Sequence, residues 1–413
     1  FRNVGRALRC LLTSCWDTWA FPDQSQCAST LSDRYNATKD PSSPLHVCAQ
    51  CKCEMACPGG ATADAGQAYE ALRRPFVQTC LNSLFCTAAN AVYKAKTVTV
   101  LRSRRYAAFL GGGTQIPADD RVTFWLDRIR NCVDCLLSLD KYRFGNCFIQ
   151  QVSGIPIGGP ISGVVLDICC ALLEHKFDRG WPNIAKRCGL NGPREHFIAA
   201  GRYADDCAML SKWFCSSCLG GFIIDVYETE IVFECTTDSI PIGRVNTLRF
   251  LDFELTFTFD VCRVDPWHKN EIATWLVNPA LKVKSRFPKP HGSAMEIKHK
   301  LRVDLCGRLA RYRMLKAHPS SLFICMLGDF VELTQLQYSL QEIKGTLDST
   351  RPHDSCYQVA VAAFKCLQGY GYHNPYSLLT YAINTHCLPI ADDHAAAHLL
   401  CKLARISRGG PGG

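Results

Sequence analysis

The sequence predicts an α+β fold, because helix-like and strand-like patterns alternate over its first part and mostly helical patterns follow. From Ala61 to about Phe259, some stretches repeat apolar residues at helical spacing and others alternate apolar with polar residues. After Asp260 the composition changes, with four prolines in the basic stretch 261–290 and helical patterns beyond it. Such alternation indicates an α/β or α+β domain, and we predict α+β.

The composition is that of a globular protein that can fold without covalent staples. At 413 residues the chain can hold two or three domains, each large enough to bury its own core. Hydrophobic residues at 47% and charged residues at 20% are ordinary for this class, and no apolar run reaches the roughly 18 to 20 residues of a membrane span. We therefore expect a soluble intracellular protein, in nucleus or cytoplasm, with no membrane partner. Because the chain begins with Phe1 and shows no leader pattern, we also expect an internal piece of a longer product.

Charge and cysteine content bear on partners and compartment. The 46 Lys and Arg outnumber the 37 Asp and Glu, and this surplus of +9 suits a phosphate-bearing partner through counterion release. The 26 cysteines are scattered through apolar stretches such as 168–172 rather than set in a regular framework. We expect most of them to be reduced thiols in the core.

The expected elements follow one another in an order that leads to an acidic pair. The first 45 or so residues show no clear periodicity and end in a turn-rich run, so we expect an incomplete leading subdomain there. Helical patterns cover about 68–93, 120–139 and 160–177, and strand patterns cover 97–101, 148–152, 197–200 and 207–210. The last two strands flank Asp205 and Asp206, and a hairpin would place these carboxylates at its tip.

The C-terminal region is basic and mostly helical in pattern. One helix face carries seven cationic residues: Lys298, Lys300, Arg302, Arg308, Arg311, Arg313 and Lys316. Such a face could grip the backbone of a nucleic-acid duplex, and a solvated helix face explains the same pattern equally well. The tail 406–413 is Gly-rich and is expected to be disordered.

The acidic pair would supply part of the carboxylates that a two-metal site needs. Nucleotidyl transfer by two metal ions needs carboxylates on separate rigid elements that converge. Two adjacent carboxylates are costly to hold together unless a cation neutralises them. An exposed Asp-Asp turn is common in proteins, but the flanking apolar strands and the preceding Tyr203 favour a site at Asp205 and Asp206.

Two segments carry a family resemblance. Tyr203–Asp206 (Tyr-Ala-Asp-Asp) resembles the third catalytic motif of reverse transcriptases, in the form common among non-LTR retrotransposons and group II introns. Gly154–Ser162 resembles the Gly-x-Pro-x-Gly-x-x-x-Ser segment of that family and lies upstream in the expected order, although many relatives have Gln where this chain has Ile157. An ordinary strand-to-helix turn is the alternative for this segment. The resemblance implies substrate-binding roles for Gly154, Pro156, Gly158, Ser162 and Tyr203.

A third carboxylate comes from a further match. Asp64–Tyr69 fits the family pattern of an Asp, four intervening residues and then an aromatic, although the Gly-rich run 58–63 before it is a poor strand by propensity. The resemblance implies that Asp64 and Asp205 bind the metals, that Asp206 supports them, and that Tyr69 lies under the sugar and excludes a 2'-hydroxyl. Rival acidic residues that fit better as helix or loop charges are Asp119, Asp120 and Asp140.

Downstream segments match the family less completely. Residues 220–224 and 228–230 fall where relatives often have a Lys near the incoming triphosphate, and no Lys occurs there, so Lys212 or a finger residue would have to substitute. Arg249–Phe253 is similar to the hairpin that holds the primer end, where relatives have Phe-Leu-Gly, which implies a primer grip at Phe250 and Leu251. A plain amphipathic strand is the alternative.

Cysteines also cluster locally. The run 46–57 contains His46 and four cysteines, dense enough to bind zinc, while 132–135 and 215–218 are Cys-x-x-Cys pairs in apolar surroundings. The irregular spacing favours free thiols over a zinc site, which stays as the alternative.

The resemblance, from Asp64 to Phe253, implies a right-hand polymerase palm with partial fingers and a helical thumb. The expected domains are a partial-finger region at 1–57, a palm at 58–260 with a finger-like insertion at 94–145, a basic linker at 261–290 and a thumb at 291–405. The implied activity is RNA-directed DNA synthesis with an RNA template, a DNA or RNA primer, dNTPs and two Mg²⁺ or Mn²⁺ ions. A decayed or repurposed nucleic-acid-binding protein and an RNA-templated RNA polymerase are the alternatives, and the oligomeric state stays open.

Overall fold

The structure is a computed structural model, and its fold is α+β as predicted. It describes residues 2–41, 46–90, 96–102, 108–112, 116–138, 141–144, 147–150, 154–155, 159–227, 230–236, 241, 243–267, 294–315, 319–349 and 355–370. The chain divides into two compact units. The second is built from Gln24–Ser29, Arg249–Thr256 and the described residues from Cys262 onward, and the first from the rest. Among the described residues, no helix is both long enough and apolar enough to cross a membrane.

The central sheet of the first unit has the order β7-β8-β1-β9. These strands span Ala199–Tyr203, Asp206–Ser211, Gly59–Asp64 and Glu234–Cys235, in the same order. β1 runs antiparallel to both β8 and β9, and β7 runs antiparallel to β8. The β7–β8 hairpin confirms the predicted hairpin, with its first strand beginning two residues later than expected.

The expectation that 58–63 is a poor strand was wrong, because this run forms β1. A Cβ at Gly59 would lie 2.0 Å from the Phe214 carbonyl oxygen, and one at Gly60 would lie 2.5 Å from the Phe257 ring. Glycine in a strand often marks such a close approach of neighbouring atoms. The composition that lowers strand propensity is therefore what allows β1 to pack here.

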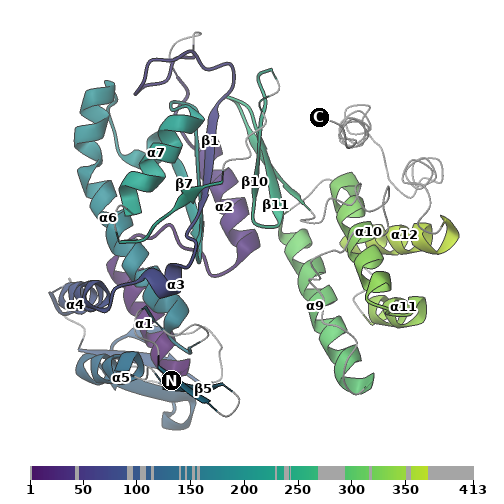
Figure 1. The fold of residues 1–413 in the computed structure, drawn as a ribbon, viewed down its shortest axis with the longest axis horizontal. Coiled ribbons are helices and arrows are strands. Elements are labelled where there is room, and N and C mark those ends of the chain that lie inside the picture. Colours follow the sequence, from purple (N-terminus) through teal and green to yellow (C-terminus); the bar gives the residue numbers. More distant parts are fainter. Residues whose placement is uncertain are drawn as a thin grey trace. The chain divides into compact units, whose positions relative to one another are not determined.

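Two helices lie together on one face of this sheet (Figure 1). They are α6 (Ser162–Cys188) and α7 (Ser216–Tyr227), which contact each other, and α7 also contacts β1 and β8. α6 is longer than the helix expected at 160–177, and it is followed by Gly189, whose φ of +73° is the left-handed conformation common after a helix. Its first half is almost continuously buried, which explains the long apolar run in the sequence.

A second sheet, of order β3-β2-β4, forms a separate layer within the first unit. Its strands are β2 (Thr97–Leu101), β3 (Ala108–Leu110) and β4 (Arg121–Trp125), and both β3 and β4 pair antiparallel with β2. The helix expected at 120–139 is thus wrong in its first part, because 121–125 pairs along β2 and only α5 (Leu126–Ser138) is helical.

The N-terminal region is helical, contrary to the expectation of no regular pattern. α1 (Arg2–Cys15) buries Val4, Leu8 and Leu11 on one face and contacts β2, β3, α4 and α5. The Arg6 guanidinium donates to the Leu101 carbonyl at 2.7 Å. A second helix, α2, spans Gln24–Asn36.

The helix expected at 68–93 is divided in two. α3 (Ala68–Ala71) ends at Leu72, which is extended, and α4 (Arg74–Asn90) begins with Pro75 in its first turn, where a missing N–H costs nothing. A small antiparallel sheet of β5 (Lys141–Phe144) and β6 (Cys147–Gln150) follows α5 along the chain.

The second unit is mainly helical. Its helices are α9 (Ala294–Met314), α10 (Pro319–Gln335), α11 (Leu340–Asp348) and α12 (Ser355–Tyr370). α11 begins with a capping box in which Ser339 and Glu342 satisfy each other's backbone N–H groups.

The cationic face expected on α9 is not uniform. Arg308 is buried and pairs with Asp329 of α10 at 2.7 Å (Nη1–Oδ1), so it belongs to the core, whereas Arg302 and Arg313 are exposed. The side chains of Lys298 and Lys300, and Lys316 as a whole, lie outside the described part of the chain.

A further three-stranded sheet has the order β10-β11-β12. Its strands are β10 (Asn246–Phe250), β11 (Phe253–Phe257) and β12 (Cys262–Pro266). β12 occupies the start of the stretch expected to be a linker, and residues 268–290 of that stretch lie outside the described chain.

Candidate active site

Four polar side chains stand in one row across the central sheet. Asp64 of β1 is directly opposite Asp206 of β8, and Asp206 is also opposite Tyr203 of β7. Glu234 of β9 lies opposite Asp64 on the other side. Directly opposite residues point to the same face, with Cβ atoms roughly 4.5–5.5 Å apart in adjacent strands. Strands far apart in the sequence therefore bring three carboxylates and a phenol to one face of the sheet.

The tip of the hairpin is tied to the end of β1. Ala204 and Asp205 connect β7 to β8, and Ala204 has a φ of +53°, the left-handed region that favours glycine. The backbone N–H of Ala65 donates to the Asp205 carbonyl at 3.0 Å. Asp205 is thereby held next to the strand that carries Asp64.

A buried ion-pair network lies behind this turn. Arg202 is fully buried and donates from Nη1 to the Ala204 carbonyl and to Asp167 Oδ1, both at 2.8 Å. Its Nε donates to Glu174 Oε1 at 2.6 Å. Glu174 also accepts from the Tyr227 hydroxyl at 2.9 Å, so these buried charges have close partners. Sequence reasoning missed this network, because an isolated Arg in a strand gives no signal of burial.

Tyr69 and the Gly-Pro segment meet through the backbone. The Ile155 N–H donates to the Tyr69 carbonyl at 2.8 Å. Gly154 has a φ of +75°, and a Cβ there would lie 2.4 Å from the same carbonyl oxygen, so only glycine fits. Ser162 is buried and begins α6. Pro156, Ile157 and Gly158 lie outside the described residues.

The Tyr69 hydroxyl is close to acidic groups of the site. Burial raises the pKa of Tyr69 above its ordinary value, and the negative charges of Asp205 and Asp167 raise this pKa further. The hydroxyl lies 4.0 Å from where a Cβ on Gly163 would be, at the start of α6. The raised pKa keeps the phenol protonated at neutral pH, and its hydroxyl lies beside the start of α6.

The rival carboxylates lie elsewhere. Asp119 is exposed in a short turn of 3₁₀-helix that precedes β4, and Asp120 belongs to the same turn, on the second sheet. Asp140 lies outside the described residues. Glu234, by contrast, joins the row of Asp64 although no sequence pattern singled it out, because β9 is only two residues long.

Lys212 is engaged in a separate interaction. It follows β8 at the end opposite Asp206, and its Nζ donates to Asp40 Oδ1 at 2.6 Å while its side chain is only 3% exposed. Residues 220–224, where relatives carry a Lys nearby, lie within α7.

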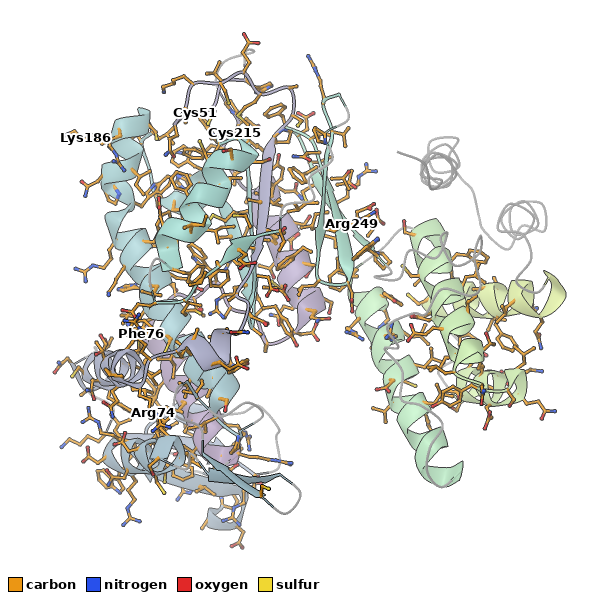
Figure 2. The ribbon with its side chains drawn as sticks, in the orientation of Figure 1. Cys51, Arg74, Phe76, Lys186, Cys215 and Arg249 are labelled. Carbon is orange, nitrogen blue, oxygen red and sulfur yellow. The ribbon has the colours of Figure 1, made fainter. Side chains whose placement is uncertain are left out.

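The expected primer grip forms the turn between β10 and β11. Phe250 and Leu251 are buried, with exposed fractions of 3% and 7%, and Leu251 has a φ of +59°. The backbone N–H of Trp267 donates to the Asp252 carbonyl at 2.8 Å, and Arg249, labelled in Figure 2, stacks over the Trp267 ring at 4.7 Å.

The donor set at the hairpin tip suits hard divalent cations. Asp64 on β1, Asp206 on β8 and Asp205 in the turn before β8 offer carboxylate oxygens, the ligands that Mg²⁺ prefers. All three residues are half-buried, which leaves their face of the sheet accessible. The chemistry of these side chains would suit a divalent cation.

Comparison with known proteins finds similarity among solved structures only. No known family model matches the chain, and neither does any curated protein. Telomerase from Candida albicans, in complex with a TWJ fragment of telomeric RNA, is 13% identical over 88% of this chain and 58% of that chain, with a TM-score of 0.42. Apo telomerase from Candida tropicalis is 10% identical over 97% of this chain and 61% of that one, with a TM-score of 0.41.

The complex of the Candida tropicalis telomerase with the same kind of RNA fragment gives 10% identity and a TM-score of 0.42, over 98% of this chain and 56% of that chain. The chain thus spans between 56% and 61% of the length of these telomerase chains. Likeness at these identities and TM-scores assigns no function to it.

Proposed function

We propose that this chain is an RNA-directed DNA polymerase of the retroelement type, which extends the 3' end of a primer along an RNA template with dNTPs. The observation that carries the proposal is the convergence of three carboxylates from separate elements. Asp64 faces Asp206 across β1 and β8, and the Ala65–Asp205 hydrogen bond holds Asp205 beside them. Two-metal nucleotidyl transfer requires such a set on rigid elements.

The carboxylates hold the metal ions in this proposal. Asp64 and Asp205 are the ligands, and Asp206 supports them from the adjacent position on β8. When bound, two Mg²⁺ or Mn²⁺ ions would activate the primer hydroxyl and stabilise charge on the triphosphate. Arg202 is a positioning residue, because it binds the Ala204 carbonyl of the turn that carries Asp205.

Tyr69 and the Gly-Pro segment shape the substrate side. The neutral phenol of Tyr69 lies near Asp205, where a ring under the sugar would exclude a 2'-hydroxyl by its volume. Gly154 brings the segment that ends at Ser162 against the Tyr69 backbone, and we assign the contact with template and nascent pair to this segment. Tyr203, in the same row as Asp64, completes this face.

A nucleic-acid-binding protein that no longer polymerises is the second candidate. Its support is the absence of Lys from 220–230 of the sequence, together with the burial of Lys212 against Asp40. A general acid for the leaving pyrophosphate would then have to come from another residue. Two residues disfavour an RNA-templated RNA polymerase. Such enzymes commonly have Gly at the position of Ala204, and Tyr69 favours synthesis of DNA.

Primer extension with matched carboxylate variants tests the proposal. The full chain is incubated with poly(rA), oligo(dT), labelled dTTP and Mg²⁺ or Mn²⁺. We expect Asp64→Asn and Asp205→Asn to abolish incorporation and Asp119→Asn, an exposed Asp in the 3₁₀ turn before β4, to leave it unchanged. Incorporation that is absent from the unmodified chain, or that survives Asp205→Asn, contradicts the proposal. Retained template–primer binding without incorporation would favour the second candidate.

A further inference from the structure

Four cysteines from distant parts of the chain converge at the other end of β1. Three come from the cysteine loop, residues 46–57, and the fourth, Cys215, immediately precedes α7. The sulfur atoms of Cys48, Cys51, Cys53 and Cys215 all lie within 4.8 Å of one another. Figure 2 shows Cys51 and Cys215 side by side, although 164 residues separate them in the sequence.

The distances between these sulfur atoms match a tetrahedral metal site. Cys51 Sγ lies 3.3 Å from Cys53 Sγ and 3.7 Å from Cys215 Sγ. Four sulfurs at the Zn–S bond length of about 2.3 Å would be separated by roughly 3.8 Å along each edge of a tetrahedron. All four cysteines are free thiols. Zinc is the metal that takes four thiolates in this geometry most often in structural sites.

The backbone shapes the cysteine loop around the cluster. The Cys48 N–H donates to the Cys53 carbonyl at 2.8 Å, and the Lys52 N–H donates to the Cys48 carbonyl at 3.1 Å. Lys52 has a φ of +62°, which reverses the chain between Cys51 and Cys53. This closed turn presents the three thiols of the loop together, with Cys48 and Cys51 at the Cys-x-x-Cys spacing of zinc sites.

A second set of contacts brings Cys215 to this turn. The Ala49 N–H donates to the Trp213 carbonyl at 2.8 Å, and the Cys215 N–H donates to Cys48 Sγ at 3.4 Å. An N–H that points at a ligand sulfur stabilises its thiolate, as outer-shell donors do in metal sites. The same segment lies against Gly59, where β1 begins.

We infer that Cys48, Cys51, Cys53 and Cys215 form a structural zinc site that joins the cysteine loop to the start of α7. Four protein ligands leave no open position for water or substrate, so the ion stabilises the fold and performs no chemistry. It would tie together the ends of β1 and β8 that lie away from the carboxylates, since Gly59 pairs with Ser211 at this end. The inference is independent of the polymerase proposal.

Cys218 is the residue that could complicate a test. Its Sγ lies 3.7 Å from Cys48 Sγ, close enough to replace a single lost ligand. A double variant, Cys51→Ser/Cys53→Ser, leaves at most three thiols even with Cys218. The matched control is Cys86→Ser/Cys135→Ser. These two cysteines are exposed like Cys51 and Cys53, but they lie away from the cluster, on α4 and α5.

The experiment measures zinc in the full chain purified with reductant. We expect about one zinc ion per chain in the unmodified protein and in the Cys86→Ser/Cys135→Ser control, and loss of nearly all of it in Cys51→Ser/Cys53→Ser. Equal zinc in the two double variants, or none in the unmodified chain after incubation with zinc, would overturn the inference.

A spectroscopic measurement on the unmodified chain covers the case in which the double variant fails to fold. X-ray absorption should show a shell of four sulfur atoms at about 2.3 Å, and cobalt(II) in place of zinc should give thiolate charge-transfer bands with the intense visible bands of a tetrahedral ion. A first shell of oxygen and nitrogen, or a disulfide between two of the four cysteines in protein isolated without air, would refute the site.

Discussion

At one end of the β1–β8 pair Asp64 faces Asp206, and at the other end Gly59 faces Ser211 beside the cysteine loop. Five steps along a strand separate these ends by about 17 Å. The carboxylate end is half-buried and offers oxygen ligands, whereas at the other end the Phe214 carbonyl lies so close to Gly59 that no Cβ would fit. Substrates can exchange only where the site is accessible, as at the carboxylate end, whereas close packing, as at the Gly59 end, stabilises the fold. Variants at the two ends should therefore separate activity from stability.

The largest expected effect is a loss of stability caused by a substitution next to the carboxylate end, where Asp64→Asn should mainly change activity. Arg202→Met removes the buried guanidinium that pairs with Asp167 and Glu174 and leaves both carboxylates without it. We expect the free energy of unfolding to fall by about 3–5 kcal/mol, because uncompensated buried charges are costly. Chemical denaturation measures the change, and Arg187→Met, an exposed Arg on α6, serves as the control. A loss below about 1 kcal/mol would mean that the network contributes little.

Asp64→Asn should give a large change in rate with little change in stability. We expect incorporation to fall at least about a hundredfold, equivalent to roughly 2.7 kcal/mol of transition-state stabilisation. The free energy of unfolding should stay the same or rise slightly, because the substitution removes one of several carboxylates that repel one another. Primer extension and denaturation, measured on the same preparation, would contradict the separation of the two ends if both changed together.

Gly59→Ala should produce the opposite pattern at the closed end. A Cβ there would lie 2.0 Å from the Phe214 carbonyl oxygen and 2.7 Å from the Cys215 carbonyl carbon. We expect a loss of about 1–3 kcal/mol in unfolding free energy, since overpacking forces backbone to move. In the control Gly221→Ala, no described atom lies within 4 Å of the added Cβ, and helix α7 should gain up to about 1 kcal/mol.

The smallest effect is expected at the turn of the carboxylate end. A residue with a Cβ is strained by about 1–2 kcal/mol at the φ of +53° that Ala204 adopts, and Ala204→Gly removes this strain. The substitution also increases the conformational freedom of the unfolded chain, which offsets about 0.5–1 kcal/mol of the gain. The net change should be a stabilisation of no more than about 1 kcal/mol. A melting temperature that falls instead would show that the Ala204 methyl makes contacts worth more than the strain.

Local sequence patterns were enough for the hairpin, the helix after the Gly-Pro segment and the mixed fold class. Apolar runs on either side of Asp205 and Asp206 predicted β7 and β8, because strands of this kind form by their own residue types. They failed at β1, where Gly59 and Gly60 lower strand propensity and yet are required by Phe214 and Phe257. They also failed at 121–125, where Val122, Thr123 and Phe124 favour the strand that pairs along β2 but were assigned to the following helix.

The sequence by itself determined the order of the motifs, the acidic tip of the hairpin and the density of cysteines at 46–57. Only the tertiary structure decided which residues meet there: Glu234 joins the row of Asp64, Arg202 lies beneath the turn, and Cys215 completes the cysteine cluster. The physical reason is that periodicity reports which side of an element is apolar. It does not report which distant element covers that side, since that choice depends on the packing of the whole chain.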